Sequence, residues 1–181
     1  MTVLRIEIEE IKNYIFIRAV KPKETKIIRQ IETLLYHFRQ IGVIPTKFER
    51  LVELAKNGFL FVAFAREHFV GCSAITAEYP DGSFEFGSWA VHTSFQRGGI
   101  GKHLLEQTLL VEKLEGKKVI AVANSNSAPI FKKMGYELIS QNNVHQDFFN
   151  FCQICSCPNK DKLNNGQKCV DKFFLLQNAV H

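Results

Sequence analysis

The sequence lacks the features that mark membrane, secreted and repetitive proteins. Its 181 residues contain no apolar run of the roughly 18 residues that a membrane-spanning helix needs. The N-terminus, MTVLRIEIEEIKNY, carries charges throughout, which is unlike a signal peptide. Low-complexity segments and internal repeats are also missing. These absences predict a cytoplasmic protein that enters no membrane and folds as one domain over residues 1–181.

Concentrated positive charge is missing as well, although the formal net charge is +5. The lysines are scattered, and basic residues do not alternate with aromatic ones as they do in many proteins that bind single-stranded nucleic acid. The charge is therefore compatible with a small anionic ligand, and it gives little support to a nucleic-acid partner.

Apolar periodicity predicts helices and strands in an informative order. Strands are expected at residues 14–20, 59–65, 69–79, 83–92, 117–123, 136–140 and 172–177, and helices at 22–41, 47–56, 100–114 and 127–134. The turn-length segments REH and PDG join three of these strands into an antiparallel meander. The third strand continues through a glycine-rich turn into a helix and a parallel strand. That succession is typical of an α/β arrangement with a ligand at the carboxyl end of the strand.

Three glycines within four residues mark this turn, in the stretch HTSFQRGGIGKHLLE. Gly98, Gly99 and Gly101 allow the backbone to come close to a ligand, and the first amides of a helix point outward without internal partners. Because such amides bind anions, the turn is expected to hold phosphate, with added charge from Arg97 and Lys102. The spacing fits neither a P-loop nor a dinucleotide-binding fingerprint. A tight turn that only packs closely is the alternative.

The stretch Gln96-Arg97-Gly98-Gly99-Ile100-Gly101 fits the signature Gln/Arg-x-x-Gly-x-Gly/Ala of the GNAT superfamily of acyl-CoA-dependent N-acetyltransferases. SWAVHTSFQRGGIGKHLLE resembles that family's strand-to-helix motif, and VIAVANSNSAPIFKKMGYE resembles its next strand and helix. The resemblance is specific over residues 59–140, looser before them, and does not cover 141–170. It implies an α/β (α+β) GNAT fold. That fold has a mixed, mostly antiparallel sheet flanked by helices, with splayed central parallel strands and here an insert before the last strand.

The resemblance also implies acetyl-CoA as co-substrate, bound where the strands ending near Val91 and Ala123 splay apart. The amides of the glycine turn would hold its pyrophosphate, and the amide of Val91 would bind the acetyl carbonyl and stabilise the oxyanion. Asn124 matches a position that contacts the pantetheine arm or orders the cleft, with a helix N-cap as the alternative. The cofactor-binding residues so implied are Val91, Gln96, Arg97, Gly98, Gly99, Ile100, Gly101, Lys102 and Asn124.

Glu85 is the candidate catalytic base, which is useful because an amine must be neutral to attack. It precedes Val91 by six residues on the same strand, so alternation is expected to put both side chains on one side. The histone-acetylating branch of the family carries a glutamate base at this spacing from the motif, which implies the same role here. The apolar surroundings FEFGSWAV are expected to raise the pKa of Glu85. A solvent-facing glutamate is the alternative.

Two neighbouring residues bear on the chemistry. Phe131 stands where many family members have a tyrosine that protonates the departing thiolate, so one usual general acid is missing. His92 follows Val91 directly, and we therefore expect its side chain to point to the opposite face and to be structural.

About thirty residues, 142–170, separate the last two expected strands, where the family normally has a short turn. They carry four of the chain's five cysteines in the spacing Cys-x2-Cys-x-Cys-x11-Cys. The candidate metal ligands are Cys152, Cys155, Cys157 and Cys169. A structural zinc held by these four or by three of them with His145, free thiols, and a redox-sensitive pair are the open alternatives. The fifth, Cys72, is expected in the core.

The acceptor side of the cleft has no family pattern that identifies its ligand. The last two strands flank that side in the GNAT fold, so the insert and the loop at residues 36–45 are expected to form its wall. Phe148, Phe149 and Phe151 would supply an apolar surface there.

Two hypotheses from different classes follow. The first is an acetyl-CoA-dependent N-acetyltransferase that moves acetyl directly to a primary amine of a small molecule, such as an amino acid or polyamine, or of a protein. The second is a non-catalytic acyl-CoA-binding sensor with metal or redox input through the cysteine insert. The sequence leaves the acceptor, the acyl chain length and the oligomeric state open, a homodimer included.

Overall fold

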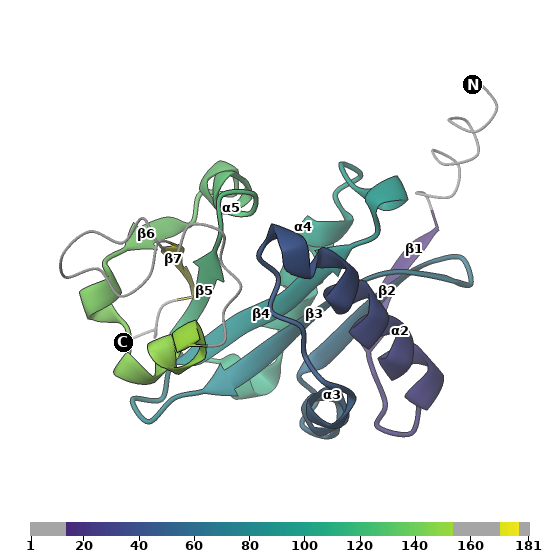
Figure 1. Ribbon diagram of the computed structural model, residues 1–181, viewed down its shortest axis with the longest axis horizontal. Coiled ribbons are helices and arrows are strands. Elements are labelled where there is room, and N and C mark those ends of the chain that lie inside the picture. Colours follow the sequence, from purple (N-terminus) through teal and green to yellow (C-terminus); the bar gives the residue numbers. More distant parts are fainter. Residues whose placement is uncertain (1–13, 154–170, 178–181) are drawn as a thin grey trace.

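The computed structural model describes residues 14–153 and 171–177. Within them, seven strands form one mixed sheet in the order β1-β2-β3-β4-β5-β7-β6 (Figure 1). The strands are β1 (Ile15–Ala19), β2 (Leu60–Ala65), β3 (His68–Glu78), β4 (Phe84–Val91), β5 (Val119–Ala123), β6 (Glu137–Ile139) and β7 (Lys172–Gln177). Neighbouring strands are antiparallel except β4 and β5, which are parallel. The expected mixed, mostly antiparallel sheet is therefore confirmed.

Four α-helices lie between these strands in the described part of the chain. They are α2 (Thr25–His37), α3 (Phe48–Lys56), α4 (Ile100–Leu109) and α5 (Ala128–Lys133). Short 3-10 segments follow several elements: η1 (Phe38–Ile41), η2 (Thr93–Phe95), η3 (Glu112–Leu114), η4 (Gln141–Asn143) and η5 (Gln146–Gln153). In the part of the chain that the structure describes, no helix has the length and apolar character needed to cross a membrane.

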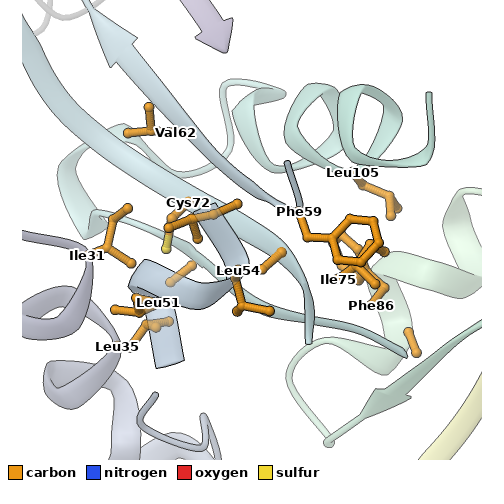
Figure 2. Packing of buried hydrophobic residues seen from close by; sticks show 14 of the residues in the cluster. Ile31, Leu35, Leu51, Leu54, Phe59, Val62, Cys72, Ile75, Phe86 and Leu105 are labelled. Carbon is orange, nitrogen blue, oxygen red and sulfur yellow. The ribbon is translucent and has the colours of Figure 1, made fainter. Parts of the chain in front are cut away.

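The helices cover both faces of the sheet. Leucines and isoleucines of α2 and α3 surround Cys72 and Val62 on one face, whereas Leu105 of α4 meets Ile75 and Phe86 on the other (Figure 2). Cys72 is fully buried, and burial raises the pKa of its thiol to about 12, which confirms the core position expected for it. This double coverage explains why β2 and β3 read as nearly continuous apolar runs.

The helix after the glycine turn is shorter than expected. Periodicity predicts a helix to Leu114, but α4 ends at Leu109 and a 3-10 turn completes the segment. Val111 adopts an extended conformation that breaks the helix, and the redirected chain buries Leu114. Apolar residues can thus reach the core from a turn as well as from a helix face.

The parallel pair opens at its carboxyl end. The β4–β5 ladder joins residues Phe84, Glu85 and Phe86 to Val119, Ile120 and Ala121, and no register pair follows. Beyond it β4 continues to Val91 and β5 to Ala123, on separate paths. The expected divergence of the central strands therefore begins immediately after Phe86.

Candidate active site at the diverging strands

A β-bulge in β4 shapes the diverging edge. Cys72 of β3 pairs with Ala90, but Ala74, two residues later, pairs with Gly87, so β4 holds one extra residue. Ser88 lies in this bulge with a φ of 45°, a conformation that few non-glycine residues adopt. The Cys72 thiol donates to the Ser88 carbonyl at 3.3 Å, so the bulge is supported from the core.

The bulge corrects the expected placement of Glu85. One extra residue reverses side-chain alternation, so Glu85 and Val91 lie on opposite faces of β4 and not on the same side. Val91 packs with Ile100 and Leu104 on the α4 face, whereas Glu85 bonds to Tyr79 on the other face. Alternation counted along an uninterrupted strand gave the wrong side because a bulge leaves no clear signal in the sequence.

The backbone of Val91 faces away from β3. The neighbouring amide of His92 donates to Val70 of β3 at 2.8 Å, so strand alternation turns the polar groups of Val91 toward the opposite edge. In agreement, the Val91 carbonyl accepts a 2.9 Å hydrogen bond from the Gln96 side chain. The amide of Val91 therefore faces the opening that β5 leaves.

The glycine turn presents unsatisfied amides at the start of α4. Arg97 and Gly99 adopt positive φ values of 65° and 80°, and Gly99 directly precedes the helix. Among the hydrogen bonds of the described residues, none uses the amides from Arg97 to Lys102 as donors. Together with the helix dipole, these amides form a favourable place for an anion. The Lys102 ammonium lies 3.6 Å from the Glu106 carboxylate, at the exposed rim.

Gly101, the third glycine of the turn, is required for packing within the protein and not for the close approach of a ligand. A Cβ on Gly101 would come within 3.1 Å of the Trp89 ring, and the Trp89 indole donates to the Gly101 carbonyl at 3.0 Å. Gly101 thus lets α4 pack closely on β4, whereas a Cβ on Gly99 would meet open space. The close-packing alternative holds for Gly101, while the positive φ explains Gly99.

Glu85 lies one residue before the end of the β4–β5 pairing, and its side chain is only partly exposed. The Tyr79 phenol donates to its Oε2 at 2.7 Å, and its side of the strand is lined by apolar residues. Burial raises the pKa of Glu85, and the hydrogen bond from the Tyr79 phenol opposes that rise by stabilising the charged form. The Thr76 hydroxyl donates to the backbone carbonyl of Glu85 at 3.4 Å. A carboxylate with a raised pKa and some remaining exposure is suited to accept a proton near neutral pH.

Asn124 holds the turn that leads into α5 and also ties down a distant loop. Its Oδ1 accepts from the amides of Asn126 at 2.9 Å and Ser127 at 3.1 Å, a cap-like pattern, although the residue at the N-cap of α5 is Ser127. Its Nδ2 donates to the Ile41 carbonyl at 2.8 Å. The polar groups of Asn124 are therefore engaged in contacts within the protein.

A second bond fixes the other end of that loop. Thr46 and Ser88 share a hydroxyl hydrogen bond of 2.9 Å, which joins the loop to the bulge of β4. We call residues 38–47 the strap, because it is bonded both to the end of β5 and to β4. Ile41 and Ile44 of the strap are 47% and 43% exposed, so the strap carries apolar surface.

Phe131 and His92 lie as expected. Phe131 is 2% exposed and packs against Trp89 and Phe174, with ring centroids 5.1 Å and 5.4 Å away. His92 lines an open depression between α2 and the sheet, on the face opposite Val91, and its Nδ1 accepts from the amide of Ser94. Neither side chain supplies an acid at the opening.

Only the first part of the cysteine insert can be compared with expectation. Phe148 stacks on Tyr79 with a centroid distance of 3.9 Å, and Phe149 lies 5.6 Å from Phe173. Cys155, Cys157 and Cys169, like the side chains of Phe151 and Cys152, lie outside the described residues. Within those residues no cluster of His, Cys, Asp and Glu could hold a metal ion. Zinc binding by the insert stays a prediction.

Sequence reasoning missed Tyr79, Thr46 and the bulge at Ser88. Tyr79 follows the end of β3, and its amide donates to the Ser83 carbonyl across the YPDGS turn. The only available signal was the length of that turn, which brings Tyr79 back beside β4. Nothing in the sequence linked Thr46 to β4, because 42 residues separate the two bonded hydroxyls.

Comparison with known proteins gives concordant results. The sequence model of the family described as "Acetyltransferase (GNAT) domain" matches residues 56–138. An uncharacterized N-acetyltransferase of Chlorobaculum tepidum is 34% identical over 113 residues, which cover 62% of this chain and 70% of that protein.

Solved structures share the fold at low sequence identity. N-acetylglutamate synthase from Neisseria gonorrhoeae, complexed with coenzyme A and N-acetyl-glutamate, is 19% identical with a TM-score of 0.66. The match covers 93% of this chain and 35% of that one. Diaminobutyrate acetyltransferase from Paenibacillus lautus, in complex with L-2,4-diaminobutyric acid and coenzyme A, is 13% identical with a TM-score of 0.61. That match covers 89% of this chain and 93% of the other.

Proposed function

This chain belongs to the GNAT family and is an N-acetyltransferase, and we propose that it moves acetyl from acetyl-CoA directly to a primary amine at the opening between β4 and β5. The observation that carries this proposal is the combination of unsatisfied amides at Arg97 to Lys102 with a partly buried Glu85 at the base of the same opening. We also propose that residues 1–181 form one domain, with the cysteine-bearing insert at about 142–170 as part of it.

The glycine turn would hold the pyrophosphate of acetyl-CoA. The proposed donors are the amides of Arg97, Gly98, Gly99, Ile100, Gly101 and Lys102. The Gln96 side chain supports the turn by bonding to the Val91 carbonyl, so its role is to shape the site. From the turn, the pantetheine arm would run along β4 into the opening, where the amide of Val91 is directed. Asn124 would border the arm by holding the strap against β5.

The chemical step needs a base on the acceptor side. As the amine nitrogen bonds to the thioester carbon, Glu85 accepts a proton from it, directly or through water, and the C–S bond breaks to release the CoA thiolate. An amide facing the opening would stabilise the oxyanion formed on the way. Because the bulge turns Glu85 to the face opposite α4, the base and the pyrophosphate turn reach the opening from opposite faces of β4.

The acceptor would lie against the strap and η5. The exposed Ile41 and Ile44 and the partly exposed Phe149 of η5 would make this border apolar. The related structures contain amino-acid ligands, but their low identity to this chain does not carry those acceptors over. An amine with an apolar portion, on a small molecule or a protein, fits this border best.

The test is acetyl-CoA turnover with a panel of amines. Free CoA should be measured by chromatography, because the five cysteines of the chain would react with a thiol dye. Release of CoA with one class of amine, matched by the acetylated amine in the mass spectrum, supports the proposal. Saturable acetyl-CoA binding without release on small amines or on protein substrates would contradict it and favour the acyl-CoA sensor.

A further inference from the structure

A buried tyrosine holds the proposed base from the side away from solvent. Tyr79 lies in the turn between β3 and β4, is 6% exposed, and donates its phenol proton to Oε2 of Glu85 at 2.7 Å. Glu85 keeps part of its surface exposed, whereas water has little access to the phenol. The hydrogen bond is therefore protected from exchange with water, and it restricts the rotation of the carboxylate.

Three elements fix the ring of Tyr79 in place. Phe148 of η5 stacks on it at 3.9 Å with an interplanar angle of 21°, and Phe173 of β7 lies 6.3 Å from Phe148. Ile120 of β5 belongs to the same buried cluster. This packing holds the phenol oxygen of Tyr79 within hydrogen-bond distance of the Glu85 carboxylate.

We propose that Tyr79 is the positioning residue of the transfer reaction, holding the Glu85 carboxylate in the orientation and the ionised form that accept the amine proton. This inference rests on the proposed role of Glu85 as the base. Tyr79 itself touches no reacting atom in this account. It acts through Glu85, and through Phe148 it links the base to the start of the cysteine insert.

The charges around the pair support a donor role for the phenol. Burial and the negative charge of Glu85 raise the pKa of Tyr79, so its proton stays on the oxygen. The carboxylates of Asp147 in η5 and Asp81 in the turn raise it further. His145 and Lys118 face Asp81, and Arg50 of α3 donates to the Thr76 carbonyl at 2.8 Å. Within the described residues, these cations thus bond to or face groups other than Glu85, whereas the Tyr79 phenol donates to its carboxylate.

The test is the pH profile of kcat/KM in Tyr79→Phe, which keeps the ring and removes the donor. The base works only when ionised, and loss of the donor makes the ionised form less stable. The acid limb should therefore move to higher pH by about 1 unit, the scale of one hydrogen bond to a charged group. Activity should recover at high pH, and the KM for acetyl-CoA should not change.

A matched control removes a hydroxyl elsewhere. Tyr136→Phe changes a partly buried tyrosine beside Phe131, away from Glu85, and its acid limb should stay at the wild-type pH. If Tyr79→Phe does not fold, Phe148→Leu carries the test, because it keeps the phenol but loosens its ring and should shift the limb in the same direction. An unshifted limb in the folded variant overturns the inference.

The failure of this inference differs from failure of the proposed function. If Glu85→Gln abolishes the acid limb while Tyr79→Phe leaves it unshifted, the base assignment stands and the positioning role is wrong. If Glu85→Gln keeps both turnover and the limb, Glu85 is not the base, and the positioning role is overturned with it.

Discussion

The two sides of β4 present their functional groups in different ways. On the α4 side, the candidate site consists of backbone amides whose directions follow from a short sequence motif and a helix start. On the other side it consists of side chains from the β3–β4 turn, β4, the strap and η5, brought together by packing. A motif can specify the first arrangement locally, whereas the second depends on contacts between segments far apart in the sequence.

The largest expected effect is on the acceptor side. Glu85→Gln keeps an acceptor for the Tyr79 phenol but cannot take a proton, so turnover should fall by about 10²- to 10⁴-fold. Steady-state kinetics with the amine identified by the panel would measure it. Glu137→Gln, at an exposed position of β6, is the control and should retain full turnover. If Glu85→Gln turns over as fast as the wild type, Glu85 is not the base.

The next effect is on the cofactor side. Gly99 has a φ of 80°, and a side chain there costs about 1–2 kcal/mol in the left-handed region. If the turn relaxes to avoid that cost, its amides move, and the KM for acetyl-CoA in Gly99→Ala should rise roughly 10-fold with little change in kcat. Gly58→Ala has the same strain at the end of α3, with φ 73° and open space around it. A KM that changes equally in both variants would contradict a specific role for the turn.

A smaller effect is expected where the two sides meet at the end of β5. Asn124→Ala removes the cap of the turn that leads into α5 and the bond to Ile41, which should lower stability by about 1–2 kcal/mol. Thermal unfolding would detect this as a lower Tm. Asn126→Ala is the control, because that residue contributes its backbone amide to the cap. An unchanged Tm in Asn124→Ala would show that the observed contacts do not stabilise the fold.

The smallest expected effect is at the strap. Thr46→Val removes the hydroxyl bonded to Ser88 and nearly conserves shape, so stability should fall by about 1 kcal/mol or less. If the strap borders the acceptor, the KM for the amine acceptor should rise about 2- to 5-fold in this variant, while the KM for acetyl-CoA stays constant. A change confined to acetyl-CoA would place the strap on the cofactor side instead.

The order of elements could be predicted because each carries a local signal. Apolar alternation, turn residues and the glycine cluster gave the strands, the meander and the start of α4. The structure differs mainly in helix length: α4 ends at Leu109, and the helix expected at residues 22–41 spans Thr25–His37 with a 3-10 segment after it. Each of these features is determined by a short local stretch of sequence.

The acceptor side could not be predicted to the same depth. The extra residue at Ser88 reverses the side-chain pattern of β4, and its main support is a thiol from the neighbouring strand. Glu85 was identified as a candidate, but its partner Tyr79 was not, because their hydrogen bond depends on how the turn folds back. The bond between Thr46 and Ser88 likewise exists only once α2, α3 and the sheet have packed together.

The central claim is that cofactor binding and proton transfer lie on opposite faces of β4 and are separable. Titration calorimetry of acetyl-CoA into the Glu85→Gln variant tests it most directly. The account predicts a Kd within about 2-fold of wild type in a variant that has lost its turnover. A Kd that weakens in parallel with turnover would contradict the account, since Glu85 would then belong to the cofactor site.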